Sequence, residues 1–83
     1  MVDADELGSE VDARGLQCPL PIIRLAAAAR LAVPGSVVTV LSTDPAAEPD
    51  IAAWCRMRNA ELVAQEWTAD DTGDFLRSRV RVG

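Results

Sequence analysis

Close to the N-terminus the sequence reads DARGLQCPLP, from Asp12 to Pro21, and this stretch is predicted to join a short strand to a helix. Gly15 predicts a turn, because glycine accepts backbone angles that other residues avoid. Pro19 and Pro21 predict the start of a helix, since proline is tolerated in the first helical turn, where its missing N–H would have no intrahelical partner. Cys18 therefore falls at about the N-cap of a helix.

This position predicts a reactive thiol at Cys18. A sulfur atom at a helix start faces the positive end of the helix dipole and the free N–H groups of the first turn, chiefly those of Leu20 and Ile22. Such a setting favours the thiolate, which is the nucleophilic form of cysteine. The alternative is that Cys18 is a small buried hydrophobic residue, as many free cysteines are.

Outward from this stretch, the chain alternates between segments typical of strands and of helices. The predicted strands are rich in β-branched or alternating apolar residues, and the first predicted helix is rich in alanine and leucine. In chain order we expect a strand at 10–13, a helix at 19–32, a strand at 36–42, a helix from 46 or 49 to 58, a strand at 62–67, a polar turn at 68–74 and a strand at 75–82.

The order β-α-β-α-β-β predicts an α/β fold. The first two strands are joined by a helix, so they should be parallel with a right-handed crossover, whereas the last two should be antiparallel neighbours across a turn. Both helices are then expected on one face of a mixed four-stranded sheet, as a two-layer sandwich. We expect residues 1–9 to form a flexible acidic N-terminal tail and residues 10–83 a single domain.

Composition narrows the classes of function. The chain has 83 residues, a net charge of −5 and no histidine, so a Cys–His nucleophile pair is excluded and direct nucleic-acid binding is not expected. The two cysteines are far apart in the sequence and predict neither a metal site nor a disulfide scaffold. No cofactor motif is found, and no signal peptide or long apolar run precedes the cysteines. We therefore expect a cytoplasmic protein with no membrane partner.

Two motifs resemble those of the TusA/SirA family of small sulfur-carrier proteins. The family pattern Asp-x-x-Gly-x-x-Cys-Pro-x-Pro is matched in register by Asp12, Gly15, Cys18, Pro19 and Pro21. A second family pattern is matched by Thr43, Asp44, Pro45 and Ala46, then by Asp50 and Ile51, and it ends at Cys55. The resemblance runs from about Val11 to the C-terminus and implies the same two-layer α/β sandwich.

The resemblance implies a sulfurtransferase-type carrier that acts through a cysteine persulfide. Cys18 would carry the persulfide, Pro19 and Pro21 would shape its loop, and no general base is required if the helix supports the thiolate. The family serves sulfur relays in tRNA thiolation, molybdenum-cofactor assembly and sulfur metabolism. The implied partners are a cysteine desulfurase or rhodanese-like donor and a downstream acceptor protein, which we expect to dock near Leu20 and Arg24.

Several roles near the motif stay open. Arg14 could add positive charge beside Cys18, or Asp12 and Arg14 could pair across the turn. We interpret Asp44 as a helix cap. Cys55 is either buried or a second thiol that resolves the persulfide by forming a disulfide.

Two alternative functions follow from the same residues. One is a thiol redox switch that uses Cys18 and Cys55, and the other is a non-catalytic regulatory or RNA-binding module.

The last predicted strand carries a row of arginines: Arg77, Arg79 and Arg81 alternate with apolar residues. They form either a docking surface or a solvated sheet face paired with acidic neighbours such as Glu66.

Overall fold

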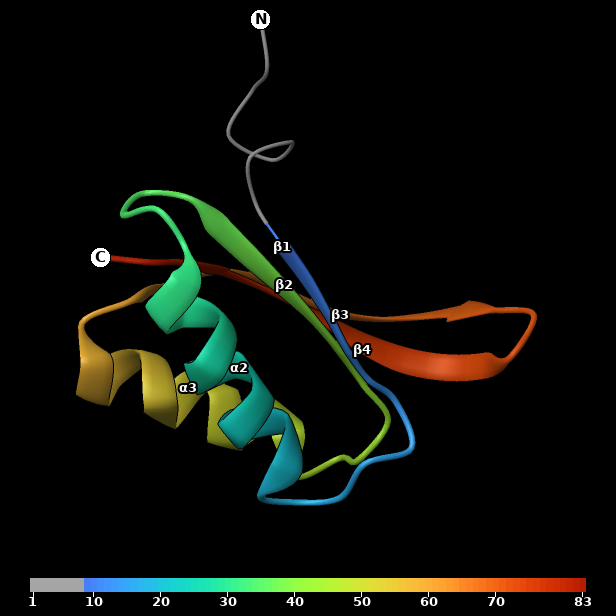
Figure 1. Ribbon diagram of the computed structural model, residues 1–83. Coiled ribbons are helices and arrows are strands. Elements are labelled where there is room, and N and C mark those ends of the chain that lie inside the picture. Colours follow the sequence, from blue (N-terminus) through green and yellow to red (C-terminus); the bar gives the residue numbers. More distant parts are fainter. Residues whose placement is uncertain (1–8) are drawn as a thin grey trace, which may run out of the picture.

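Strands and helices follow one another in the predicted order in the computed structural model, which describes residues 9–83 (Figure 1). Their bounds, in chain order, are β1 (Ser9–Ala13), α2 (Leu20–Leu31), β2 (Val37–Ser42), α3 (Ala47–Arg58), β3 (Glu61–Asp70) and β4 (Gly73–Arg81). The predicted acidic tail lies outside the described residues except for Ser9, which begins β1.

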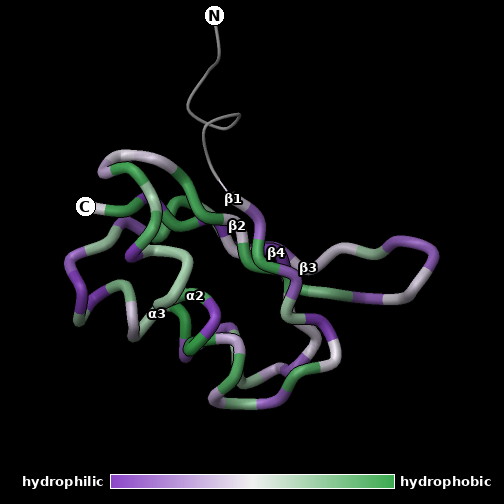
Figure 2. The backbone as a smooth tube through the Cα atoms, viewed as in Figure 1, coloured by the Kyte–Doolittle hydropathy of each residue, from purple (hydrophilic) through white to green (hydrophobic). Residues whose placement is uncertain are grey.

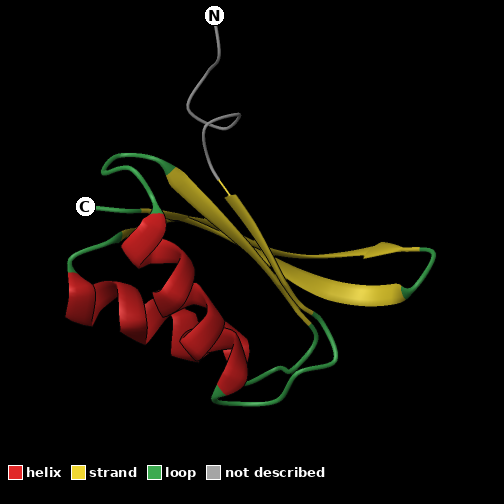
Figure 3. Cartoon of the chain, viewed as in Figure 1, coloured by secondary structure: helices red, strands yellow, loops and turns green. Residues whose placement is uncertain are grey.

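The four strands form one mixed sheet in the order β1-β2-β4-β3. As predicted, β1 and β2 are parallel, with Val11 opposite Val40, and β3 and β4 are antiparallel. β4 also pairs antiparallel with β2, so the last strand of the chain lies in the interior of the sheet. Figure 3 shows α2 and α3 together on one face of this sheet, which confirms the two-layer α/β sandwich.

The core lies between the helices and the inner face of the sheet. β2 is buried along nearly its whole length, and Figure 2 shows hydrophobic colouring along it. This explains its nearly continuous β-branched sequence, because a central strand is covered on most sides. The buried core cluster consists of Ala13, Leu25, Val38, Val40, Ala47, Ile51, Cys55, Leu76 and Val80.

Both helices begin with a proline in the first turn. Pro21 is buried at the start of α2, and Pro49 lies at the third residue of α3. Neither proline interrupts its helix, because the first-turn N–H groups have no intrahelical acceptor. α3 ends at Arg58, and its C-cap Asn59 has a φ of 56°, the left-handed conformation typical of a helix C-terminus.

The polar turn predicted at 68–74 is wrong in extent. β3 continues to Asp70 and β4 resumes at Gly73, so the turn itself is only Asp71 and Thr72. Asp70 Oδ1 accepts a hydrogen bond of 2.8 Å from Thr72 N, which closes the turn locally. The hairpin reaches past the paired part of β2, and the side chains of residues 69–74 at its end are exposed. Polar residues can therefore continue the strands there (Figure 1).

The arginines of β4 lie on the sheet face opposite the buried Leu76 and Val80. Arg77 Nη1 lies 3.5 Å from an oxygen of Glu66, and Arg81 Nη1 lies 3.0 Å from an oxygen of Glu61. These pairs are exposed, and each contributes less than about 1 kcal/mol to stability. They favour the interpretation of this row as a solvated face with acidic neighbours.

Candidate functional site

Cys18 is exposed on the loop that joins β1 to α2. Pro19 is the N-cap of α2 and Leu20 is its first residue, so Cys18 lies one residue before the N-cap, close to the predicted position. Cys18 therefore stands just outside the helix. Its backbone N–H donates a hydrogen bond of 2.9 Å to Asp44 Oδ2, which fixes the backbone under the thiol.

The free N–H groups expected to support a thiolate are already occupied. Leu20 N donates to the carbonyl oxygen of Gln17 at 2.8 Å, and Ile22 N donates to that of Pro19 at 3.1 Å. These bonds form because the chain turns tightly into the helix, which brings preceding carbonyl groups within reach. The expectation that Leu20 and Ile22 stabilise the sulfur anion is therefore wrong.

A carboxylate from the second helix contacts the sulfur instead. The Cys18 Sγ–H donates a hydrogen bond of 3.2 Å to Asp50 Oδ2, and Asp50 lies in the first turn of α3. This bond is the largest cause that raises the pKa of the Cys18 thiol; desolvation and the charges of Asp50 and Asp44 act in the same direction. In this free form of the protein the site favours the thiol, not the thiolate.

Asp44 joins the two loops beneath the site. Its Oδ2 accepts from Cys18 N, and its Oδ1 accepts from Ala46 N at 3.0 Å. These two bonds hold the pKa of the Asp44 carboxyl below its usual value. Asp44 is not the N-cap of α3 as predicted, because the N-cap is Ala46; Asp44 instead accepts a hydrogen bond from the N–H of that N-cap residue. A second link joins the same loops, since Gly15 N donates to Thr43 Oγ1 at 2.8 Å.

Asp12 and Arg14 pair across the turn, which settles the choice left open by the sequence. The guanidinium donates to both Asp12 oxygens, at 2.9 Å and 2.8 Å, and also to Asp70 Oδ2 at 2.9 Å. It also lies over the ring of Phe75, 5.2 Å from the centroid. Hydrogen bonding to Arg14 lowers the pKa of Asp12 to about 2. Arg14 thus braces the turn against the β3–β4 hairpin.

Cys55 belongs to the core and not to the exposed site. Its side chain is 2% exposed, it packs within the core cluster on α3, and burial raises the pKa of its thiol. Both cysteines are free thiols. The arrangement brings together Cys18 with Asp44 and Asp50, and it leaves Cys55 covered.

The side chains predicted to meet a partner are exposed. Leu20 is 41% exposed at the first position of α2, and Arg24 is exposed one turn further along the same helix. Pro19 is exposed beside Cys18, whereas Pro21 is buried at the second residue of α2.

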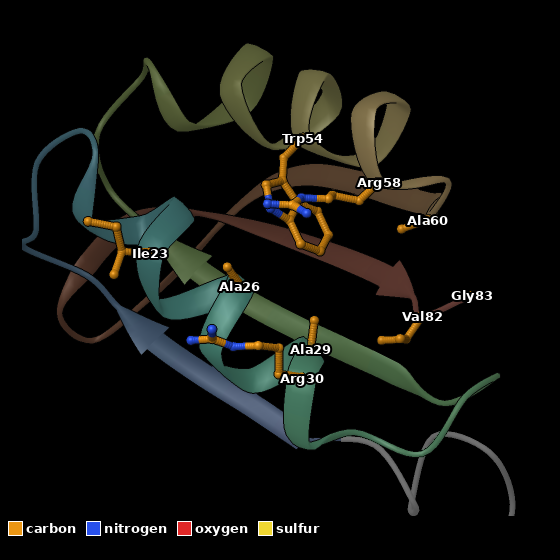
Figure 4. A pocket seen from close by; sticks show the side chains of 9 residues that line it. All are labelled: Ile23, Ala26, Ala29, Arg30, Trp54, Arg58, Ala60, Val82 and Gly83. Atoms are coloured by element: carbon orange, nitrogen blue, oxygen red, sulfur yellow. The ribbon is translucent and has the colours of Figure 1, made fainter.

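A separate groove lies between the two helices. Its volume is about 420 Å³, and Figure 4 shows Trp54 and Arg58 of α3 above Ala26, Ala29 and Arg30 of α2. Cys18 does not line this groove.

Neither a metal site nor a membrane-spanning helix is found among the described residues. Across 9–83, no group of three or more His, Cys, Asp or Glu side chains is placed to hold a metal ion. No helix in this part of the chain is long and apolar enough to cross a membrane.

Comparison with known proteins places the chain in a family. A family model described as "Sulfurtransferase TusA" matches residues 9–82. The chain belongs to the TusA family.

Individual proteins also align with most of the chain. The protein YrkI of Bacillus subtilis is 34% identical over 73 residues, which are 88% of this chain and 92% of YrkI. "Sulfur carrier protein TusA" of Pseudomonas paraeruginosa is 36% identical over 66 residues, which are 80% of each chain. The crystal structure of a SirA-like protein from Desulfitobacterium hafniense matches with a TM-score of 0.65 and 29% identity, covering 87% of this chain and 95% of that one.

Sequence reasoning missed the contact between Asp50 and Cys18. Asp50 stands 32 positions after Cys18, on a different helix, so no local pattern links the two. The available signal was the second motif, in which Asp44 and Asp50 both match the family pattern. Both carboxylates contact Cys18, one at its backbone and one at its sulfur.

Proposed function

We propose that this protein is a sulfur carrier that accepts a sulfane sulfur on Cys18 and passes it to another protein. The observation that carries the proposal is the exposure of Cys18, on a braced loop at the start of α2, in a chain of the TusA family. Relatives that match most of this chain are named sulfur carriers, which supports the same role here.

The chemistry needs one accessible sulfur and no cofactor. In the loading step, Cys18 Sγ as thiolate attacks the outer sulfur of a donor persulfide. A new S–S bond forms on Cys18, the donor S–S bond breaks, and its electron pair stays on the donor cysteine. The balance is one thiol and one persulfide on each side, so no external oxidant or reductant is consumed. Delivery repeats the step, with an acceptor thiolate attacking the outer sulfur held by Cys18.

We propose that the partner proteins supply specificity, because Cys18 is exposed and can be reached by another protein. We propose a cysteine desulfurase or a rhodanese-like protein as donor and a further relay protein as acceptor. Their docking face would surround Cys18 and include Leu20 and Arg24, which are both exposed on α2. The end point would be tRNA thiolation, molybdenum-cofactor assembly or sulfur metabolism. We expect the relay to run in the cytoplasm, where thiols stay reduced.

Intact-mass spectrometry tests the carrier function. The wild-type protein, Cys18→Ala and Cys55→Ala are each incubated with a cysteine desulfurase and cysteine, and in parallel with a rhodanese donor. We expect one added sulfur atom in the wild type and in Cys55→Ala, its removal by reductant, and no addition in Cys18→Ala. Absence of any gain in the folded wild type with both donors would refute the proposal.

A further inference from the structure

The site around Cys18 opposes the ionisation that sulfur transfer requires. The thiolate is the attacking form, yet the Sγ–H is held by Asp50 Oδ2 at 3.2 Å. The first-turn N–H groups of Leu20 and Ile22 are bonded to backbone carbonyls and cannot offset that charge. Sulfur transfer by such a thiol therefore needs an interaction that promotes its ionisation.

The charged groups that act on this thiol are both negative. Asp50 reaches it from α3, and Asp44 acts from the loop between β2 and α3; both raise the pKa of the thiol. The guanidinium of Arg14, on the same loop as Cys18, is engaged by Asp12 and Asp70. Arg14 is therefore not available to pair with the sulfur, and a partner protein can supply the positive charge that would release a thiolate.

We propose that Asp50 is an electrostatic gate on Cys18, which a partner protein opens by placing a cationic side chain against the Asp50 carboxylate. In the free protein the gate keeps the sulfur as a hydrogen-bonded thiol. In the complex, the cation pairs with Asp50, the hydrogen bond to Sγ is released, and the thiolate forms only where a donor persulfide is present. Asp50 is only partly buried, so a partner side chain can reach it.

This inference rests on the proposed carrier function, and it adds the fate of the proton. The proton leaves Cys18 for solvent as the cation pairs with Asp50, and Sγ then attacks the outer sulfur of the donor persulfide. The donor cysteine departs as a thiolate and takes up a proton from solvent. Overall, a Cys18 thiol and a donor persulfide become a Cys18 persulfide and a donor thiol, with no net change in protons or electrons.

The first test measures the reactivity of the free thiol. Alkylation of Cys18 by iodoacetamide is followed by intact mass across a pH series in the wild type, Asp50→Asn and Glu48→Gln. Glu48 lies in the same turn of α3, and its carboxylate bonds Trp67 Nε1, so its variant removes the same charge without touching the thiol. We expect several-fold faster alkylation at neutral pH in Asp50→Asn, an earlier rise with pH, and wild-type rates in Glu48→Gln.

Asp50→Ser, which also suits a first helical turn, guards against a fold defect in the asparagine variant. If both folded Asp50 variants react at the wild-type rate or slower, Asp50 does not restrain the thiol and the gate is overturned. That result would leave the carrier function standing, because alkylation involves no sulfur donor.

The second test measures single-turnover loading of Cys18 by a persulfidated donor at several salt concentrations. We expect wild-type affinity for the donor to fall as salt rises, and Asp50→Asn to bind several-fold more weakly with a smaller salt dependence. At saturating donor, Asp50→Asn should load at least as fast as the wild type. Slower loading at saturation would contradict the gate and indicate that Asp50 itself takes the proton. Sulfur gain in Cys18→Ala would instead refute the carrier function.

Discussion

The carboxylate of Asp44 holds the backbone of Cys18, through a hydrogen bond of 2.9 Å between Asp44 Oδ2 and Cys18 N. Its other oxygen accepts from Ala46 N at 3.0 Å, so one side chain connects the loop that carries the thiol to the start of α3. The position of the thiol relative to Asp50 therefore depends on a residue that does not touch the sulfur.

We predict that Asp44→Ala lowers both stability and sulfur loading. The substitution removes the acceptors of two backbone N–H groups, so the loop loses its link to α3. Asp44→Asn should fall between this variant and the wild type, because an amide has one acceptor oxygen where the carboxylate has two. Urea unfolding reports the stability, and single-turnover loading reports the function. Wild-type loading in Asp44→Ala would show that the loop is positioned by other contacts.

The bond between Asp12 and Arg14 predicts a loss of stability in acid. The pKa of Asp12 falls from its ordinary 3.8 to about 2 in the folded protein, so the folded state binds the proton less readily than the unfolded state. The stabilisation is fully present above the unfolded value and is lost as the pH falls from about 4 towards about 2. In Asp12→Asn, stability should therefore change less with pH between about 4 and about 2.

Urea midpoints measured along a pH series from neutral to acid check this prediction. Asp74→Asn, which removes an equal charge elsewhere on the surface, is the matched control. An acid profile of Asp12→Asn that coincides with that of the wild type would show that the pair does not contribute to stability.

We predict that a substitution at Ile51, the residue after Asp50, strongly lowers the stability of the protein. Ile51 is fully buried, and Ile51→Ala should lower the free energy of unfolding by about 2–5 kcal/mol because it leaves a cavity. Met57 lies on the same helix and is 79% exposed, so Met57→Ala should change stability by no more than about 0.5 kcal/mol. Urea unfolding of both variants measures the difference, and equal effects would contradict the assigned burial.

Local sequence patterns predicted the fold well. The β-branched run now seen as β2, and Pro19 and Pro21 at the start of α2, each identify an element from its own residues. The polar residues from Thr68 to Asp74 led to a wrong prediction of a long turn. The end of the hairpin is exposed to solvent, so polar residues there do not mark the end of a strand. The placement of β4 between β2 and β3 depends on contacts across the whole chain.

The chemistry at Cys18 was predicted less well than its position. A local interpretation takes account of the helix start and expects a thiolate, as the motif alone suggests. In the structure, Asp50 on the second helix accepts a hydrogen bond from the Cys18 thiol. The N–H groups of Leu20 and Ile22 donate to nearby backbone carbonyl groups. The protonation of a thiol is set by all the charges around it in space, and a sequence pattern includes only those near it in the chain.

Locating the transferred sulfur tests the account most directly. The wild-type protein is loaded by a persulfidated donor, separated from it, and fragmented intact in the mass spectrometer. We predict that the added sulfur atom lies on the fragment that contains Cys18, and that it leaves when an acceptor thiol protein is added. Added sulfur on Cys55 or elsewhere, with Cys18 unmodified in a folded protein, would contradict the account.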